Sequence, residues 1–277
     1  MDETRVAVAK KNNTGAEIWI YDLESGAGTR LTAGGIHGRP LWSADDRWIY
    51  YAEVTIEGAF GDVFRVRADG SGPPESVLTA AGDFVYRPEA LTADGRTLVV
   101  DRARTDAYTP DVLLYDMESA EFEAVADADV GEYNARLSPD GRYVVYARSL
   151  EVGSAEARLQ IRDLETRATY PVVAHNAHYA RWSADGSELF YVQVGINTSD
   201  IMMRVPVTLG DRLEVGPPQE MFTVDISLGG SRGFSVTADG QRFLYSELPG
   251  SLATNPLEEV RVVVGWLNQL QARVPQR

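Results

Sequence analysis

Apolar and polar residues alternate through most of this chain in short runs that are separated by polar turns. In Tyr133–Ala147, an alternating run is followed by Pro139-Asp140-Gly141-Arg142 and then by the β-rich run Tyr143–Ala147. Proline fixes φ early in a tight turn, aspartate can bond its own backbone, and glycine takes a positive φ without steric cost. The pattern therefore predicts two antiparallel strands joined by a tight turn, with the apolar positions facing a core.

The same hairpin pattern recurs along the chain. The other copies are Leu41–Ala52, Ala90–Asp101, Arg181–Val192 and Ser235–Ser246. The turn aspartates lie 49, 46, 45 and 54 residues apart, at Asp45, Asp94, Asp140, Asp185 and Asp239. A repeat of roughly 40–50 residues is typical of four-stranded propeller blades.

Each hairpin is followed by a third strand and a short fourth strand. The third strands are Glu17–Gly26, Asp62–Gly72, Asp111–Ser119 and Arg158–Thr166, of which all but the last open with an acidic residue. Short fourth strands follow at sites such as Arg30–Thr32 and Ser76–Thr79. Four strands per repeat with no long helical pattern between them predict an all-β protein, a β-propeller.

We predict six four-stranded blade units in a single domain, residues 1–270. The units are 1–33, 34–80, 81–127, 128–174, 175–224 and 225–270, with the first lacking its inner strand and the last lacking a clear fourth strand. Trp266, Leu267 and Leu270 are compatible with one amphipathic turn, so a short helical or extended tail is expected before the polar end, 271–277. Because the first unit begins inside a blade, the chain is expected to be the C-terminal part of a longer protein.

Composition narrows the functional classes. With 277 residues, 44% of them hydrophobic, the chain should form a large core, and it has no apolar run of 18 or more residues that would predict a membrane span. The formal net charge of −15 argues against nucleic acid as a partner, because such recognition begins with a basic surface. The chain has no cysteine, which predicts no disulfides and fits an exported or a cytosolic protein equally.

No catalytic, metal or cofactor site is predicted. Gly229–Gly233 matches G-x-S-x-G, but a strand follows it instead of a helix, and no histidine comes after Ser231. His175 and His178 lie far in sequence from the third histidine, and metal sites need three or four converging ligands. No glycine-rich phosphate loop precedes a helix.

A candidate ligand site is predicted from the loops that enter the inner strands, which should gather at one mouth of the central channel. In register, these loops supply a cationic and aromatic set: His37, Arg39, Tyr86, Arg87, Tyr133, Asn134, His178, Tyr179 and Arg232. On so acidic a chain, this set could attract a protein, a peptide or an anionic small molecule. The alternative is structural, with arginines paired to neighbouring acids and tyrosines packed between blades.

The S/T-x-D-G hairpins, the Asp-led third strands and the short Arg-Leu-Thr strand resemble the TolB-type, WD40-like β-propeller repeats of bacteria. The resemblance covers almost the whole chain and implies a propeller in an extracytoplasmic or periplasmic location, although a cytoplasmic one stays open. The closing run VVVGWLNQL, residues 262–270, is similar to the tails of bacterial Ser/Thr kinases in which such a propeller is C-terminal.

The resulting expectation is a non-enzymatic binding propeller, the sensor or scaffold part of a longer bacterial protein such as a receptor-type Ser/Thr kinase. Two enzymatic alternatives stay open, because propellers host many functions. One is the propeller of a prolyl-oligopeptidase-type peptidase, with its catalytic domain on a separate chain. The other is a hydrolase or lyase with its site at the channel mouth.

Overall fold

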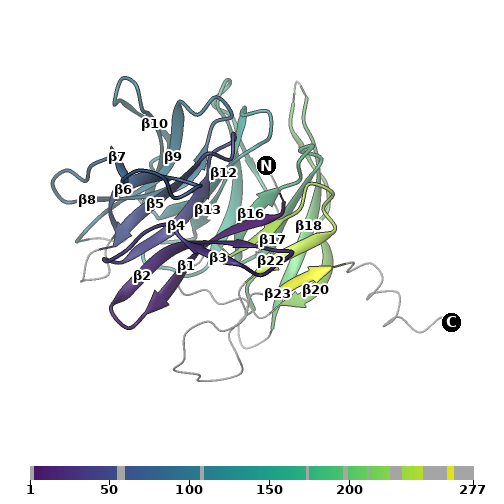
Figure 1. Cartoon of the computed structure of the whole chain (residues 1–277). Helices are drawn as coiled ribbons and strands as arrows, with labels where there is room; N and C mark the ends of the chain where they lie inside the picture. Colours follow the sequence, from purple (N-terminus) through teal and green to yellow (C-terminus); the bar gives the residue numbers. More distant parts are fainter. Residues whose placement is uncertain are drawn as a thin grey trace. The chain divides into compact units, whose positions relative to one another are not determined.

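A computed structural model of the chain describes residues 3–54, 60–106, 109–172, 175–195, 199–210, 212–224, 233–245 and 261–264. All regular structure in these residues is β-strand, and the strands form six antiparallel sheets (Figure 1). Within each sheet the strands pair mainly in chain order, so each sheet is a meander of hairpins.

The first three sheets come from the N-terminal half of the chain. The first contains β1 (Arg5–Asn12), β2 (Gly15–Asp22) and β3 (Gly28–Arg30). The second contains β4 (His37–Trp42), β5 (Trp48–Val54), β6 (Phe60–Arg67) and β7 (Glu75–Leu78). The third contains β8 (Phe84–Leu91), β9 (Thr97–Arg104), β10 (Asp111–Asp116) and β11 (Phe122–Ala126).

The last three sheets differ more from one another. The fourth contains β12 (Glu132–Leu137), β13 (Tyr143–Ser149), β14 (Ala157–Asp163) and β15 (Thr169–Pro171). The fifth contains β16 (Ala177–Trp182), β17 (Glu188–Gln193), β18 (Asp200–Thr208), β19 (Glu214–Val215) and β20 (Gln219–Val224), and both β19 and β20 pair with β18. The sixth contains β21 (Phe234–Val236), β22 (Arg242–Tyr245) and β23 (Arg261–Val264).

The all-β propeller architecture is confirmed, but the prediction of six four-stranded blade units is wrong. The described residues form five blades, the consecutive sheets from β1–β3 to β16–β20. The sixth sheet has only three strands of three or four residues each, and β23 is separated from β22 by the undescribed residues 246–260. The hairpin signal at Asp239 therefore marks a short sheet and not a blade. The predicted tail, 265–277, lies outside the described residues, and no helix occurs in the part described.

The turn chemistry that defines the repeat is the same in all five hairpins. A serine or threonine hydroxyl donates to the turn aspartate two residues later, at 2.5–2.7 Å. The same hydroxyl oxygen accepts the N–H of the residue five positions on, at 2.9–3.1 Å. One hydroxyl group thus binds both the carboxylate of the turn aspartate and a backbone N–H on the other side of the turn, which fixes where each hairpin reverses.

The second strands are buried on both faces. In β5, Ile49 and Tyr51 pack in a cluster with Ile18 and Ile20 of the first sheet. Tyr50, between them in sequence, packs in a different cluster with Leu98 of the third sheet. Alternate residues of one strand therefore contact opposite neighbouring sheets, which explains why these strands read as nearly continuous apolar runs.

The described residues fall into two compact units. Unit 1 comprises those up to Ala135 together with Glu151–Gly153, and unit 2 comprises the rest from Arg136 onward. In unit 1, β4 packs against β1 and β2, and β8 packs against β5 and β6. In unit 2, Phe190, Met202 and Phe243 form a core between the fifth and sixth sheets.

We expect Ser183→Ala to lower the free energy of unfolding by about 1–2 kcal/mol, because it leaves the Glu188 N–H without its buried acceptor. The matched control is Ser187→Ala, which also removes a hydroxyl that donates to Asp185 but does so at an exposed position, and which should change stability little. Urea denaturation of both variants measures the difference. Equal losses in the two variants would contradict the role given to Ser183.

Candidate functional site

The first strands carry a repeated backbone irregularity six residues before the turn aspartate. At this position Arg39, Asn134 and Tyr179 have φ values of 58°, 58° and 57°, and Gly233 has 80°. In β4 and in β16 the pairing register shifts around it, between Gly38 and Leu41 and between His178 and Arg181, so two residues oppose one. Such bulges re-aim side chains and are common beside functional sites.

The third sheet solves the same position differently. Pro88 stands there, and its ring holds φ near −65°, so a left-handed conformation is impossible. The register shift moves to between Pro88 and Ala90, which leaves Glu89 as the extra residue of the strand. The Glu89 side chain is fully buried.

Glu89 belongs to a buried charged cluster, which we define as Arg39, Arg87, Glu89, Asp101 and Asn134, all in unit 1. Arg39 Nη1 donates to Glu89 Oε1 at 2.7 Å and approaches Asn134 Oδ1 at 3.4 Å. The backbone N–H of Asn134 donates to Asp101 Oδ2 at 3.0 Å. Strands β4, β8, β9 and β12 are thereby joined by polar contacts inside an otherwise apolar region.

Asp101 is the least stabilised charge of this cluster. Its side chain is fully buried, and its Oδ1 has no hydrogen-bond partner in the described part of the protein. Burial, and next the charge of Glu89, raise the pKa of Asp101 to about 7, although Arg87, the Asn134 N–H and Arg39 oppose that shift. Arg87 lies directly opposite Asp101 in the β8–β9 ladder. Asp101 therefore holds its proton to a higher pH than an exposed aspartate does.

Unit 2 presents a different site at the equivalent position. A depression of about 460 Å³ is lined by Ala155, Glu156, Asn176, His178, Tyr179, Val194 and Gly195. Its walls are largely apolar. Asn176, His178 and Tyr179 come from the start of β16 and the residue before it, and the exposed Glu156 comes from the residue before β14. This size is within the range of small-molecule sites, which combine apolar walls with a few placed polar groups.

His178 in this depression is held in a defined orientation. Asn176 Nδ2 donates to the Val194 carbonyl at 2.9 Å, which directs Asn176 Oδ1 toward His178 Nε2 at 3.0 Å. Nε2 therefore carries the hydrogen. Burial lowers the pKa of His178 to about 4, so the ring is neutral at physiological pH.

Tyr179 is positioned by a glycine. A Cβ at Gly233 would lie 2.6 Å from Cγ of Tyr179, so only glycine allows this close approach, and its φ of 80° also favours glycine. The two aromatic rings of His178 and Tyr179 lie 6.0 Å apart, tilted by 40°. The start of β16 thus presents an imidazole and a phenol side by side.

The remaining predicted site residues lie in more ordinary surroundings. His37 Nδ1 is 2.8 Å from the Thr32 hydroxyl, and its ring packs edge-on against Tyr51. Tyr86 is buried and stacks on Phe122 with ring centroids 5.5 Å apart. Tyr133 lies on β12, half-buried. Arg232 lies outside the described residues.

The structure brings together three predicted residues, Arg39, Arg87 and Asn134, with two that sequence reasoning missed. Glu89 and Asp101 each break the repeat: Asp101 stands where the other second strands have Ala52, Ala147 and Val192. A carboxylate at a position that is otherwise small and apolar was the signal available.

Two negative findings concern only the described residues. They contain no group of three His, Asp or Glu side chains that could hold a metal ion. No helix among them is long and apolar enough to cross a membrane.

Repeated antiparallel meanders with bulged first strands define a β-propeller protein. No protein-family model matches the chain, and no curated protein matches its sequence. Its structure is similar to that of TolB from Acinetobacter baumannii, with 16% identity and a TM-score of 0.72 over 94% of this chain. The chain spans 65% of the length of that TolB.

Two further solved structures share the fold. An oligogalacturonate lyase in complex with manganese has 14% identity and a TM-score of 0.62, covering 94% of this chain and 86% of the lyase. A Mycobacterium tuberculosis puromycin-hydrolyzing peptidase has 14% identity and a TM-score of 0.59, covering 88% of this chain and 42% of the peptidase. The likeness extends to TolB-type propellers and to enzymes, and at these identities it shows the fold alone.

We expect Asp101→Asn to gain stability relative to the original chain as pH rises from 5 to 8.5. The raised pKa means that the folded chain holds a proton between about pH 4 and 7 that the unfolded chain has released, so the contribution of Asp101 is lost as pH rises through 7. Asparagine keeps the shape and stays neutral. Urea denaturation at each pH measures the difference between variant and original, in which the effect of His178 cancels. A difference that does not change with pH would contradict the shifted titration.

Proposed function

We propose that this chain is a non-enzymatic binding propeller whose ligand or partner contacts the start of β16, around His178 and Tyr179. The observation that carries the proposal is the depression there, where a neutral, oriented imidazole and a phenol lie among largely apolar walls, with the exposed Glu156 as the one charged residue among the described lining residues. Uncharged hydrogen-bonding groups on an apolar surface suit recognition, because they orient a ligand at a small desolvation cost.

The buried charged cluster of unit 1 supports a structural role for the first strands there, and leaves ligand contact to β16 in unit 2. Arg39 and Glu89 neutralise each other, and both side chains are at least nine-tenths buried. In this proposal Arg39, Arg87 and Asn134 hold the first strands of unit 1 in place, and the equivalent position of unit 2 contacts the partner. The partner is a protein, a peptide or a small molecule that inserts a largely apolar group with one hydrogen-bonding function.

We further propose that the chain is part of a longer bacterial protein that works outside the cytoplasm, such as a receptor-type Ser/Thr kinase. The support is the resemblance of residues 262–270 to the tails of such kinases and the similarity of the fold to TolB. The test is to sequence the gene upstream of Met1. A kinase domain followed by an apolar span of about 20 residues would support the proposal, and a signal peptide with a few more strands would replace it with a free periplasmic propeller.

A second candidate function is an enzymatic one, since the same fold occurs in a lyase and in a peptidase. In this alternative the depression at His178 would face a substrate, either within this chain or beside a separate catalytic chain. The two functions differ in what happens to a bound molecule.

We expect Ala155→Trp to abolish binding at the depression, because Ala155 is an exposed lining residue and an indole there would fill the space. A fragment library, screened by thermal shift against the full chain, supplies the probes. The matched control is Val152→Trp, an exposed position in the same loop that does not line the depression. Fragments that protect the original chain should still protect the Val152→Trp variant but not the Ala155→Trp variant.

Mass spectrometry of the bound fragments separates the two functions. Unchanged fragments support the binding role, and cleaved fragments support the enzymatic one. If no fragment protects the original chain, or if both variants bind equally well, the depression is not the binding site.

A further inference from the structure

The final position of the third strand is the same residue type in three blades. The residue is aspartate: Asp22 ends β2, Asp116 ends β10 and Asp163 ends β14. In the pairing with the preceding strand they lie opposite Arg5, Thr97 and Tyr143, and the last two of these come three residues after the aspartate of the hairpin turn. In each case Oδ1 accepts two backbone N–H groups of the following turn. An aspartate here is thus part of the repeat, with a structural duty in closing the third turn.

In two of these blades an arginine from the hairpin turn is neutralised beside it. Arg142, two residues after its turn aspartate, binds Asp163 at 2.8 Å. Arg96, at the same repeat position, binds Glu118 at 3.0 Å. The repeat therefore supplies an acidic partner for this arginine from the end of the adjacent strand.

The second blade reverses the charge at this position. β6 ends in Arg67, directly opposite Trp48, where three other blades have aspartate and the fifth has Pro206. In this blade the turn after the third strand is closed by Asp69 instead, which accepts the N–H of Ser71 at 2.8 Å. Arg47, the equivalent of Arg96 and Arg142, consequently has no carboxylate within ion-pair distance among the described residues, and neither has Arg67.

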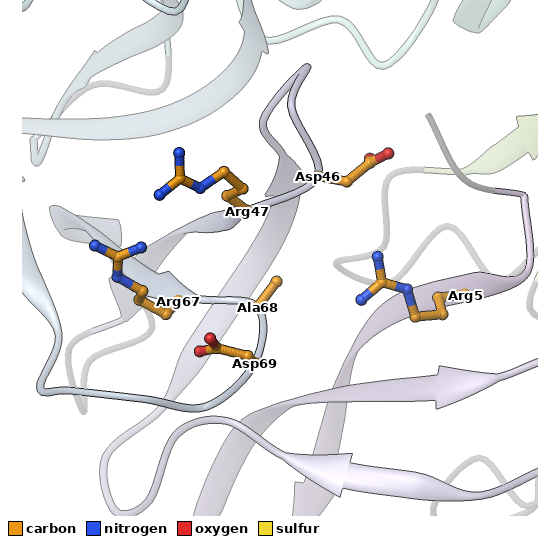
Figure 2. Close-up of a pocket in the computed structure, with 6 residues that line it drawn as sticks. All are labelled: Arg5, Asp46, Arg47, Arg67, Ala68 and Asp69. Atoms are coloured by element: carbon orange, nitrogen blue, oxygen red, sulfur yellow. The ribbon is translucent and has the colours of Figure 1, made fainter.

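These two arginines line a depression of about 150 Å³ in unit 1, together with Arg5, Asp46, Ala68 and Asp69. Figure 2 shows the guanidinium groups of Arg47 and Arg67 extending to the same side, while Arg5 lies on the other side of Asp46 and Ala68. The lining carries three cationic and two anionic side chains, a net positive charge on a chain of −15.

Two of the guanidinium groups are held by tryptophans. Arg67 lies over the Trp48 ring at 4.4 Å, and Arg5 lies over the Trp42 ring at 4.9 Å. Stacking uses the flat face of a guanidinium and leaves its N–H edge directed outward. In Arg67, an N–H edge fixed in this way matches the two oxygens of a carboxylate, phosphate or sulfate group.

We propose that Arg47 and Arg67, in the depression that they line, bind an oxyanion, as a free ion or as the acidic group of a small molecule. The site lies at the turn end of β4, away from the bulge at Arg39 near the start of that strand, so it is independent of the function proposed for β16. The carboxylate of Asp69 is a hydrogen-bond acceptor in the same lining, which favours ligands whose hydroxyl group, next to the acidic one, donates to it.

The test measures binding of inorganic phosphate, sulfate and acetate to the full chain by titration calorimetry at constant ionic strength set with chloride. Arg67→Asp introduces the residue that the first, third and fourth blades have, and gives Arg47 the partner that Arg142 has in Asp163. Arg47→Gln removes the charge without touching a stacked side chain. The matched control is Arg96→Gln, the same repeat position in the next blade, where the arginine is already paired with Glu118.

The expected result is phosphate or sulfate binding that weakens about tenfold or more in Arg67→Asp and in Arg47→Gln and is unchanged in Arg96→Gln. Binding of acetate alone would assign the site to planar carboxylates, and stronger binding of the tetrahedral ions would assign it to phosphate or sulfate. No binding of any anion to the original chain, or equal weakening in all three variants, would overturn the proposal. A thermal unfolding transition for each variant confirms that it is folded.

Discussion

The ion pair between Arg39 and Glu89 is the contact on which the arrangement of unit 1 depends. It joins the first strands of two blades, β4 and β8. Asn134, on β12 of another blade, accepts from Arg39 and donates its backbone N–H to Asp101 of β9. Removing one member would leave the other as an unpaired buried charge. The loss of folding free energy would then be far larger than the contribution of the intact pair. Because the backbone bulge aims Arg39 inward, the left-handed residue and the ion pair have to be understood together.

The sequence predicted the repeating hairpins well because their turn residues act locally. Serine or threonine, aspartate and glycine specify each turn through contacts only two to five residues apart. The number of blades was harder to predict, since the Asp239 hairpin has the same local chemistry but joins only short strands. Local signals identify a hairpin and do not report how many strands will add to it.

The candidate sites were predictable only in part, because they depend on contacts between residues far apart in the sequence. Register placed Arg39, Arg87 and Asn134 at equivalent loops, but the partners Glu89 and Asp101 come from β8 and β9, and only the fold brings them there. Pro88 illustrates the difficulty, because its fixed φ moves the bulge by one residue and so turns Glu89 inward. The unpaired state of Arg47 likewise depends on the end of β6, twenty residues away in sequence.

The shared second strand has a consequence for how the sequence can change over time. Alternate residues of β5 contact different neighbouring sheets. A substitution at Tyr50 therefore changes the packing of one hydrophobic cluster, and a substitution at Tyr51 changes the packing of another. Each inter-sheet core can therefore be repacked with little effect on the next. Blades of this kind can diverge one interface at a time, which fits a fold that persists at 14–16% identity to its structural relatives.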